Sequence, residues 1–62
     1  MPAYRITFSH SAMAPDYIGS AIKYAHTPEE AAKYLGKFDK KAKSIVDNRR
    51  NLLTNVSIEL IS

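Results

Sequence analysis

The chain has 62 residues, of which 45% are hydrophobic, with no cysteine and a formal net charge of +3. This length supports one domain with a small core, so residues 1–62 are expected to form a single unit. The absence of cysteine excludes disulfides and thiolate ligands, and two histidines are too few for a zinc site, so no metal or cofactor is expected. No apolar run approaches the roughly 20 residues of a membrane span, and the N-terminus lacks a signal-peptide pattern, which predicts a cytoplasmic protein.

The first predicted strand covers residues 4–9. Tyr4, Ile6 and Phe8 alternate with polar residues there, which is the period of a half-buried strand. Residues 9–16 contain Pro15 among small and polar residues, and this composition predicts a loop.

Residues 17–26 fit two patterns. One is a strand face made of Ile18, Ile22 and Tyr24, and the other is a helical stripe made of Tyr17, Ile18, Ala21, Ile22 and Ala25. Gly19 and Ser20 are indifferent helix formers. A new helix start follows directly after this segment, so whatever precedes it has ended, and a strand is favoured.

The helix start is Thr27-Pro28-Glu29-Glu30, with Thr27 as the N-cap, Pro28 at the first helical position and Glu30 completing a capping box. The apolar positions that follow keep the helical phase of about 100° per residue. They are Ala31, Leu35, Phe38, Ala42, Ile45 and Val46. This phase predicts one long helix over residues 27–48. The alternative is a break at Gly36, with Asp39 capping a second short helix.

The last predicted strand covers residues 55–60, where Val56, Ile58 and Leu60 alternate with polar residues. The predicted fold class is therefore α+β: a small two-layer ββαβ domain with a three-stranded, mostly antiparallel sheet and one long helix packed on one face. Placing the last strand beside the first would make the sheet entirely antiparallel. The exposed face of the sheet would then carry Arg5, Thr7, Ser9, Lys23, Asn55, Ser57 and Glu59.

The basic residues are concentrated in one stretch, because residues 33–50 hold seven of the nine Lys and Arg residues and two acidic ones. Lys33, Lys37 and Lys41 are spaced four apart, and Lys40 points the same way, so a helix would align the four on one face. Glu29 could pair with Lys33, whereas Lys37, Lys40 and Lys41 have no obvious helical partner. Arg49 and Arg50 would stabilise the helix end.

We therefore predict a non-enzymatic binding module whose basic helix face contacts nucleic acid or a ribonucleoprotein. Two alternatives remain open: an ordinary solvated helix face, or a small protein-binding modulator or inhibitor of the phage or mobile-element type, with an acidic protein surface as its partner. The small core and the open sheet edges also allow a homodimer.

The aromatic residues Tyr4, Phe8, Tyr24 and Phe38 are expected in the core, and Tyr17 at an interface. No catalytic site is predicted at Ser9-His10-Ser11, because adjacent residues rarely point at one another and no acid nearby would orient His10.

Pro2 would become the N-terminal residue if the initiator methionine were removed. In this respect the chain resembles the 4-oxalocrotonate tautomerase family, whose N-terminal proline is a general base. The resemblance implies a tautomerase-like enzyme that uses Pro2, and it covers only Pro2 and the strand behind it. That family also clamps its substrate with arginines, whereas the arginines here are expected in the first strand and at the helix end.

Overall fold

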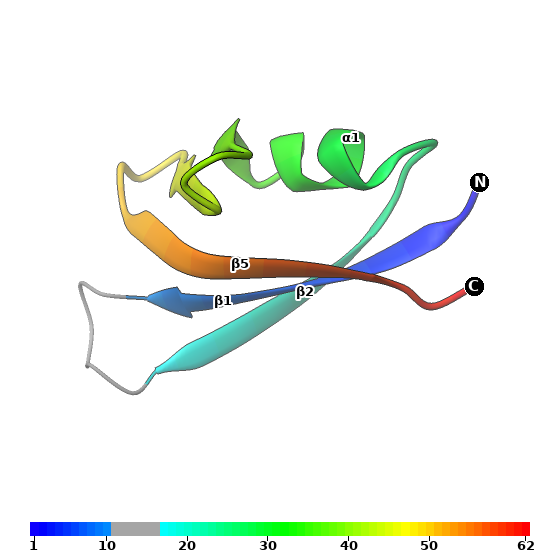
Figure 1. The fold of residues 1–62 in the computed structure, drawn as a ribbon, viewed down its shortest axis with the longest axis horizontal. Helices are drawn as coiled ribbons and strands as arrows, with labels where there is room; N and C mark the ends of the chain where they lie inside the picture. The colour runs from blue at the N-terminus through cyan, green and yellow to red at the C-terminus, as the bar shows by residue number, and fades with distance from the viewer. Residues whose placement is uncertain (11–16) are drawn as a thin grey trace.

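The computed structural model describes residues 1–10 and 17–62, and its main feature is a five-stranded antiparallel sheet with one short helix (Figure 1). The elements are β1 (Ala3–His10), β2 (Ile18–Tyr24), α1 (Pro28–Lys33), β3 (Gly36–Asp39), β4 (Ser44–Asp47) and β5 (Leu52–Leu60). The strand order is β2-β1-β5-β4-β3. The prediction of a three-stranded sheet with one long helix was therefore wrong.

Three predicted strands are confirmed. β1 and β2 form an antiparallel hairpin, which settles residues 17–26 as a strand, and β5 contains the predicted final strand. The last strand lies beside the first, since β5 pairs with β1 in the antiparallel direction, so of the arrangements considered the entirely antiparallel one forms. Of the predicted loop, residues 11–16 lie outside the described residues, while Ser9 and His10 belong to β1.

The helix begins where the sequence predicts but ends much earlier. The hydroxyl of Thr27 accepts the N–H of Glu30 at 3.1 Å, which confirms the N-cap, and the helix ends at Lys33 after six residues. Gly36 then runs so close to β4 that an added Cβ would overlap the Val46 carbonyl oxygen and lie 2.7 Å from the Cα of Asp47. The chain is therefore a strand at this point, and neither the continuous helix nor a second helix capped by Asp39 forms.

The spacing of apolar residues that predicted a long helix is instead produced by the β3–β4 hairpin. Phe38 and Ile45 are direct cross-strand partners, and both pack toward the core. They are seven residues apart, which is close to two helical turns. A hairpin and a helix therefore place this pair on the same side. Ala42, which the helix would have placed in the apolar stripe, is exposed in the turn.

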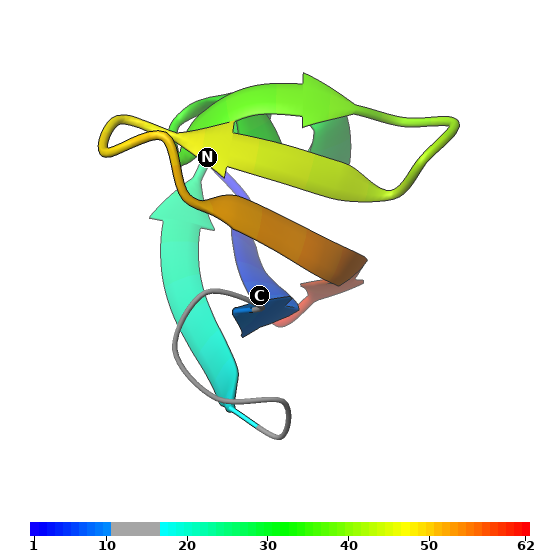
Figure 2. The ribbon, with the colours of Figure 1, turned by 90° about the vertical axis from the view of Figure 1, so that its left-hand side faces the viewer.

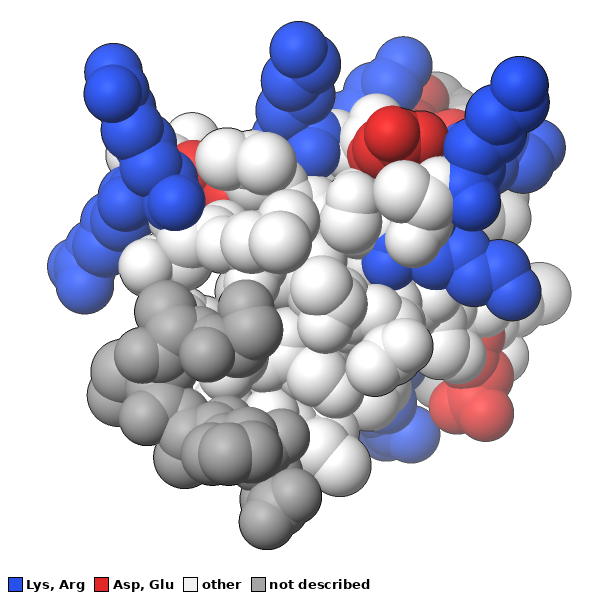
Figure 3. Space-filling model, turned by 60° about the vertical axis from the view of Figure 1, so that its left-hand side comes forward, with Lys and Arg blue, Asp and Glu red and all other residues white. Residues whose placement is uncertain are grey.

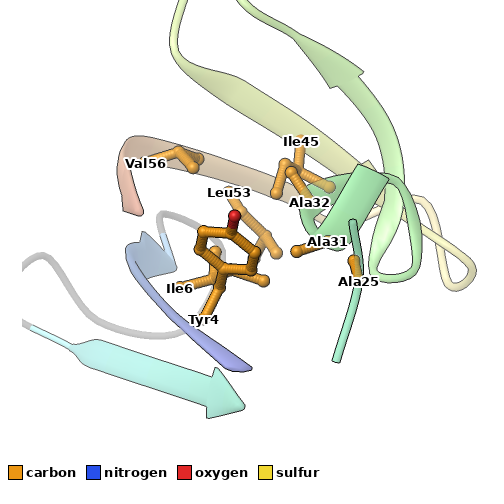
Figure 4. Close-up of a cluster of buried hydrophobic side chains, with 8 residues drawn as sticks. All are labelled: Tyr4, Ile6, Ala25, Ala31, Ala32, Ile45, Leu53 and Val56. Carbon is orange, nitrogen blue, oxygen red and sulfur yellow. The ribbon is translucent and has the colours of Figure 1, made fainter. Parts of the chain in front are cut away.

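The core lies between the helix and the concave side of the sheet (Figure 4). Ala31 and Ala32 are fully buried, and their small side chains let the helix lie close to the sheet. The largest fully buried side chains among the described residues are Ile6 and Ile45. Figures 1 and 2 show that the sheet is strongly curved, with β3 and β4 lying at the level of α1 above β1 and β2. The β3–β4 hairpin thus closes the core beside the short helix.

A β-bulge in β5 keeps two apolar residues, one on each side of it, on the core side. Asn55 has a left-handed backbone conformation with φ 51°, and the β1–β5 register shifts between Thr7 and Ser9. The bulge absorbs one residue, so Leu53 and Val56, three positions apart, are both buried. Beside the bulge, the N–H of Val56 donates to the carbonyl of Lys43 at 3.0 Å, which ties the hairpin turn to β5.

β2 turns toward the core the face that the sequence analysis had predicted to be exposed. Lys23 is the partner of Tyr4, which is buried, so Lys23 lies on the core side of the sheet. The outer side of β2 carries Ile18, Ile22 and Tyr24, which are 68%, 52% and 64% exposed. The predicted outer face was therefore wrong for Lys23, and the predicted burial of Tyr24 was also wrong. Five other positions of that face, Arg5, Thr7, Ser9, Ser57 and Glu59, do share the outer side, and Asn55, which lies in the bulge of β5, is exposed as predicted.

Candidate phosphate-binding surface

The four lysines predicted to form one helix face lie on different elements. Lys33 is the last residue of α1, Lys37 is in β3, and Lys40 and Lys41 are in the turn between β3 and β4. The prediction of a basic helix face was wrong because α1 ends before Lys37. Lys37, Lys40 and Lys41, which we call the hairpin lysines, nevertheless line one open hollow of about 460 Å³. Lys33 is not part of that lining.

The turn that carries two of these lysines is built by Asp39. Its Oδ1 accepts the backbone N–H groups of Lys41 at 3.1 Å and Ala42 at 3.2 Å. This arrangement is typical of aspartate at the start of a turn. Lys43 then adopts φ 51°, which turns the chain back into β4. The carboxylate in the middle of the hairpin is thus bonded to the backbone and holds the lysines in place.

Lys40 also forms an ion pair with Glu29, at 3.2 Å between Nζ and Oε1. The pairing of Glu29 with Lys33 that the sequence suggested is replaced by one with Lys40, for which the predicted helix offered no partner, because the hairpin folds back over the start of α1. The Lys40 side chain is 78% exposed, and ion pairs at such positions contribute about 0–1 kcal/mol. A phosphate group could therefore compete with Glu29 for Lys40.

Lys43 is a basic residue of the hairpin that the helical interpretation did not single out. It lines a second open hollow of about 330 Å³ together with Lys40, Glu29 and Val56. The signal that could have identified it is the Asp39 turn, because a hairpin places Lys43 in the same turn as Lys40 and Lys41.

Arg49 and Arg50 lie in the turn between β4 and β5, and the prediction that they stabilise a helix end was wrong. Asp47 builds this turn: its Oδ1 accepts the backbone N–H groups of Asn51 at 2.8 Å and Arg49 at 2.9 Å. Arg50 has φ 64° and donates its N–H to the Asp47 carbonyl at 3.0 Å. The hydrogen bond from the Asn51 backbone, followed by that from Arg49, lowers the pKa of Asp47 below its usual value of 3.8.

Both acidic residues of the basic stretch therefore organise turns, and the cations around them project outward. Figure 3 shows Lys and Arg side chains standing at intervals along the margin of a face that is otherwise largely uncharged. Extended cations around a neutral face suit a polyanion, because each side chain can reach a separate phosphate. They give no base-specific geometry.

A third hollow, of about 350 Å³, lies at the far end of β1 and is lined by Phe8, His10, Tyr17, Leu35, Asp47, Asn48, Arg49 and Leu53. The rings of His10 and Tyr17 meet edge to face at 6.0 Å. The Nδ1 atom of His10 is buried and has no hydrogen-bond partner among the residues that the structure describes. Tyr17 is 49% exposed, so it was correctly kept apart from the aromatic residues expected in the core, and its place at an interface stays a prediction.

Pro2 lies at the opposite end of β1, where its carbonyl accepts the N–H of Ala25 at 3.1 Å. The eight residues of β1, about 26 Å of strand, separate it from the hollow that Arg49 lines. Arg5 is on the outer face and pairs with Glu59 at 3.3 Å. The structure thus does not bring Pro2 together with Arg49.

Within residues 1–10 and 17–62, no three His, Asp or Glu side chains form a group that could hold a metal ion. No helix in the same two segments is long and apolar enough to cross a membrane. Comparisons of the chain with protein-family models, with curated proteins and with solved structures find no match.

Proposed function

We propose that the chain is a non-enzymatic binding module that contacts the phosphate backbone of nucleic acid through the β3–β4 hairpin. The observation that supports this proposal is that Lys37, Lys40 and Lys41 line one hollow of the β3–β4 hairpin, whose Asp39 carboxylate is already bonded to backbone N–H groups. Lysine is a flexible point charge, which suits phosphate contacts that do not depend on sequence.

The hairpin presents these charges on a firm support. Phe38 and Ile45 pack beneath it in the core, and the bond from Val56 N–H to the Lys43 carbonyl fixes its turn to β5. The lysine side chains themselves are exposed and need no rearrangement of the fold to reach a ligand. Binding would therefore lower mainly the side-chain freedom of the lysines.

The test is fluorescence anisotropy with a labelled 20-base-pair DNA duplex and with a single strand of the same length, at several KCl concentrations. If the three hairpin lysines each neutralise one phosphate, the log–log slope of affinity against salt on duplex DNA is about −2.7. Affinity then falls about 40-fold between 50 and 200 mM KCl. The triple variant Lys37→Gln, Lys40→Gln, Lys41→Gln should lose this salt-dependent binding.

Lys33→Gln is the matched control, because it removes one exposed lysine of the same stretch that lies outside the hollow. It should bind nearly as well as the unaltered chain. Absence of any complex at 50 mM KCl with either nucleic acid would reject the proposal and favour an acidic protein as the partner of the hairpin. Equal affinity of the triple variant and the control would place binding on another surface.

A further inference from the structure

The second feature that points to a partner is the free edge of β2. β2 is an outer strand of the sheet, and no other strand in the described part of the chain pairs with its outer edge. It is seven residues long, and its only charged side chain is Lys23. The opposite edge of the sheet is β3, which has four residues, two of them charged, and is followed directly by Lys40 and Lys41. Short and heavily charged edges are protected from strand addition. β2 is longer than β3 and carries one charge, Lys23, so it is the less protected of the two edges.

The hydrogen-bond pattern shows which backbone groups of β2 are available. His10 N–H donates to the Tyr17 carbonyl and Ala25 N–H donates to the Pro2 carbonyl, so the odd-numbered residues between 17 and 25 face β1. Antiparallel strands alternate between hydrogen-bonded and non-hydrogen-bonded pairs. The N–H and C=O groups of the even-numbered residues therefore point to the open edge. These residues are Ile18, Ser20, Ile22 and Tyr24.

We propose that β2 pairs with β2 of a second copy of this chain, antiparallel and centred on Ala21, so that two five-stranded sheets join into one. In this register Ile18 faces Tyr24 of the partner subunit, and Ser20 faces Ile22 of the partner subunit. All four even-numbered residues then form hydrogen-bonded pairs, each exchanging two bonds. No other antiparallel self-pairing uses every outward backbone group of the strand.

Charge favours the same register. Lys23 lies opposite Gly19 of the partner subunit, which has no side chain, so the two lysines of the dimer are not direct partners. Two copies joined instead through β3 would bring two sets of hairpin lysines toward one edge, where like charges repel. A second copy is therefore accommodated at β2 and disfavoured at β3.

The side chains of the outer face also fit a second copy. Ile18, Ile22 and Tyr24 are exposed by half or more, which is unusual for three apolar side chains on one short strand. Across the proposed interface, Ile18 would contact Tyr24 of the partner subunit, an aromatic and β-branched pair of the kind that stabilises sheets. Ile22 would lie diagonally across the interface from Ile22 of the partner subunit. The pairing thus brings the two apolar rows side by side on one face of the joined sheet, where they contact each other along the interface.

Sedimentation velocity at 1–500 µM chain tests this inference, in 500 mM KCl and without nucleic acid so that the hairpin lysines contribute nothing. The expected species has twice the 6.9 kDa mass of one chain. Ser20→Pro removes an N–H that points to the open edge and none that bonds to β1, so it should weaken the dimer at least about tenfold while the monomer stays folded. Ser20→Thr keeps the N–H and should leave the dimer intact. Circular dichroism of both variants monitors the fold.

Disulfide formation checks the register independently, because the chain has no cysteine of its own. Ala21→Cys places the two thiols in a directly opposed, non-hydrogen-bonded pair at a Cα separation of about 4.5 Å, within the range that a disulfide spans. Ser20→Cys places them in a diagonal position and should cross-link poorly. A monomer at 500 µM, a dimer that is insensitive to Ser20→Pro, or faster cross-linking through position 20 than through position 21 would each overturn the inference.

Discussion

Gly36→Ala separates the two possible conformations of residues 34–47 by the sign of one measurement. In a helix, alanine is favoured over glycine by about 1 kcal/mol, so the substitution would raise the free energy of unfolding. In the structure, the new Cβ would overlap the Val46 carbonyl oxygen and lie 2.7 Å from the Cα of Asp47. Carbon atoms in contact need about 3.5–4.0 Å, so β3 must move away from β4 by about 1 Å.

The displaced atoms are backbone, which cannot rotate out of the way, so a loss of about 1–3 kcal/mol is expected, as for overpacked sites. With a urea m-value of about 1 kcal/mol/M for so small a chain, the midpoint should fall by about 1 M or more. A urea titration monitored by circular dichroism measures this midpoint. Gly19→Ala is the control, because its Cβ would meet side chains and no backbone atom: the Phe8 ring at 2.8 Å and the Tyr17 ring at 3.4 Å, and side chains can shift. A Gly36→Ala chain as stable as the original would refute the close pairing of β3 and β4.

The remaining predictions concern a turn, a cap and the core. Because the pKa of Asp47 is lowered in the folded state, its carboxylate stabilises the fold above about pH 4, and this contribution is lost as the pH falls through the folded-state pKa. Asp47→Asn should therefore reduce the decline of the urea midpoint between pH 5 and pH 2.5. A decline as steep as in the unaltered chain would contradict the role of Asp47. Thr27→Ala should cost about 1 kcal/mol by removing the acceptor of the Glu30 N–H, with Thr27→Ser in the same urea titration restoring most of it. Ile45→Ala should cost about 2–5 kcal/mol, since Ile45 is fully buried, and a loss below 1 kcal/mol in thermal unfolding would argue against its place in the core.

The sequence predicts the parts of this fold that depend on local signals. The cap at Thr27, the alternation in β1 and the final strand are all local, and the structure confirms them. The hairpin was missed because Phe38 and Ile45 are spaced so that a helix and a hairpin bury the same residues. The contact of Gly36 with β4, which is not local, distinguishes the two.

The orientation of β2 and the candidate site show the same limit. Periodicity tells which residues of β2 share a face, but the pairing of Lys23 with Tyr4 decides which face meets the core. The hairpin lysines were identified as a group from composition and spacing. Their common location is a hairpin rather than a helix, and the contact of Lys40 with Glu29 could not be predicted without the fold.

The position of β5 has a consequence for the time course of folding. β5 is the last strand of the described chain to be synthesised, yet it lies in the middle of the sheet, between β1 and β4. The β1–β2 and β3–β4 hairpins can each form from neighbouring residues as the chain emerges from the ribosome. Joining them requires β5, whose pairing of Tyr4 with Leu60 closes a loop of nearly the whole chain. Such distant pairing slows folding, so the two hairpins should wait as separate, partly formed units until the final strand arrives.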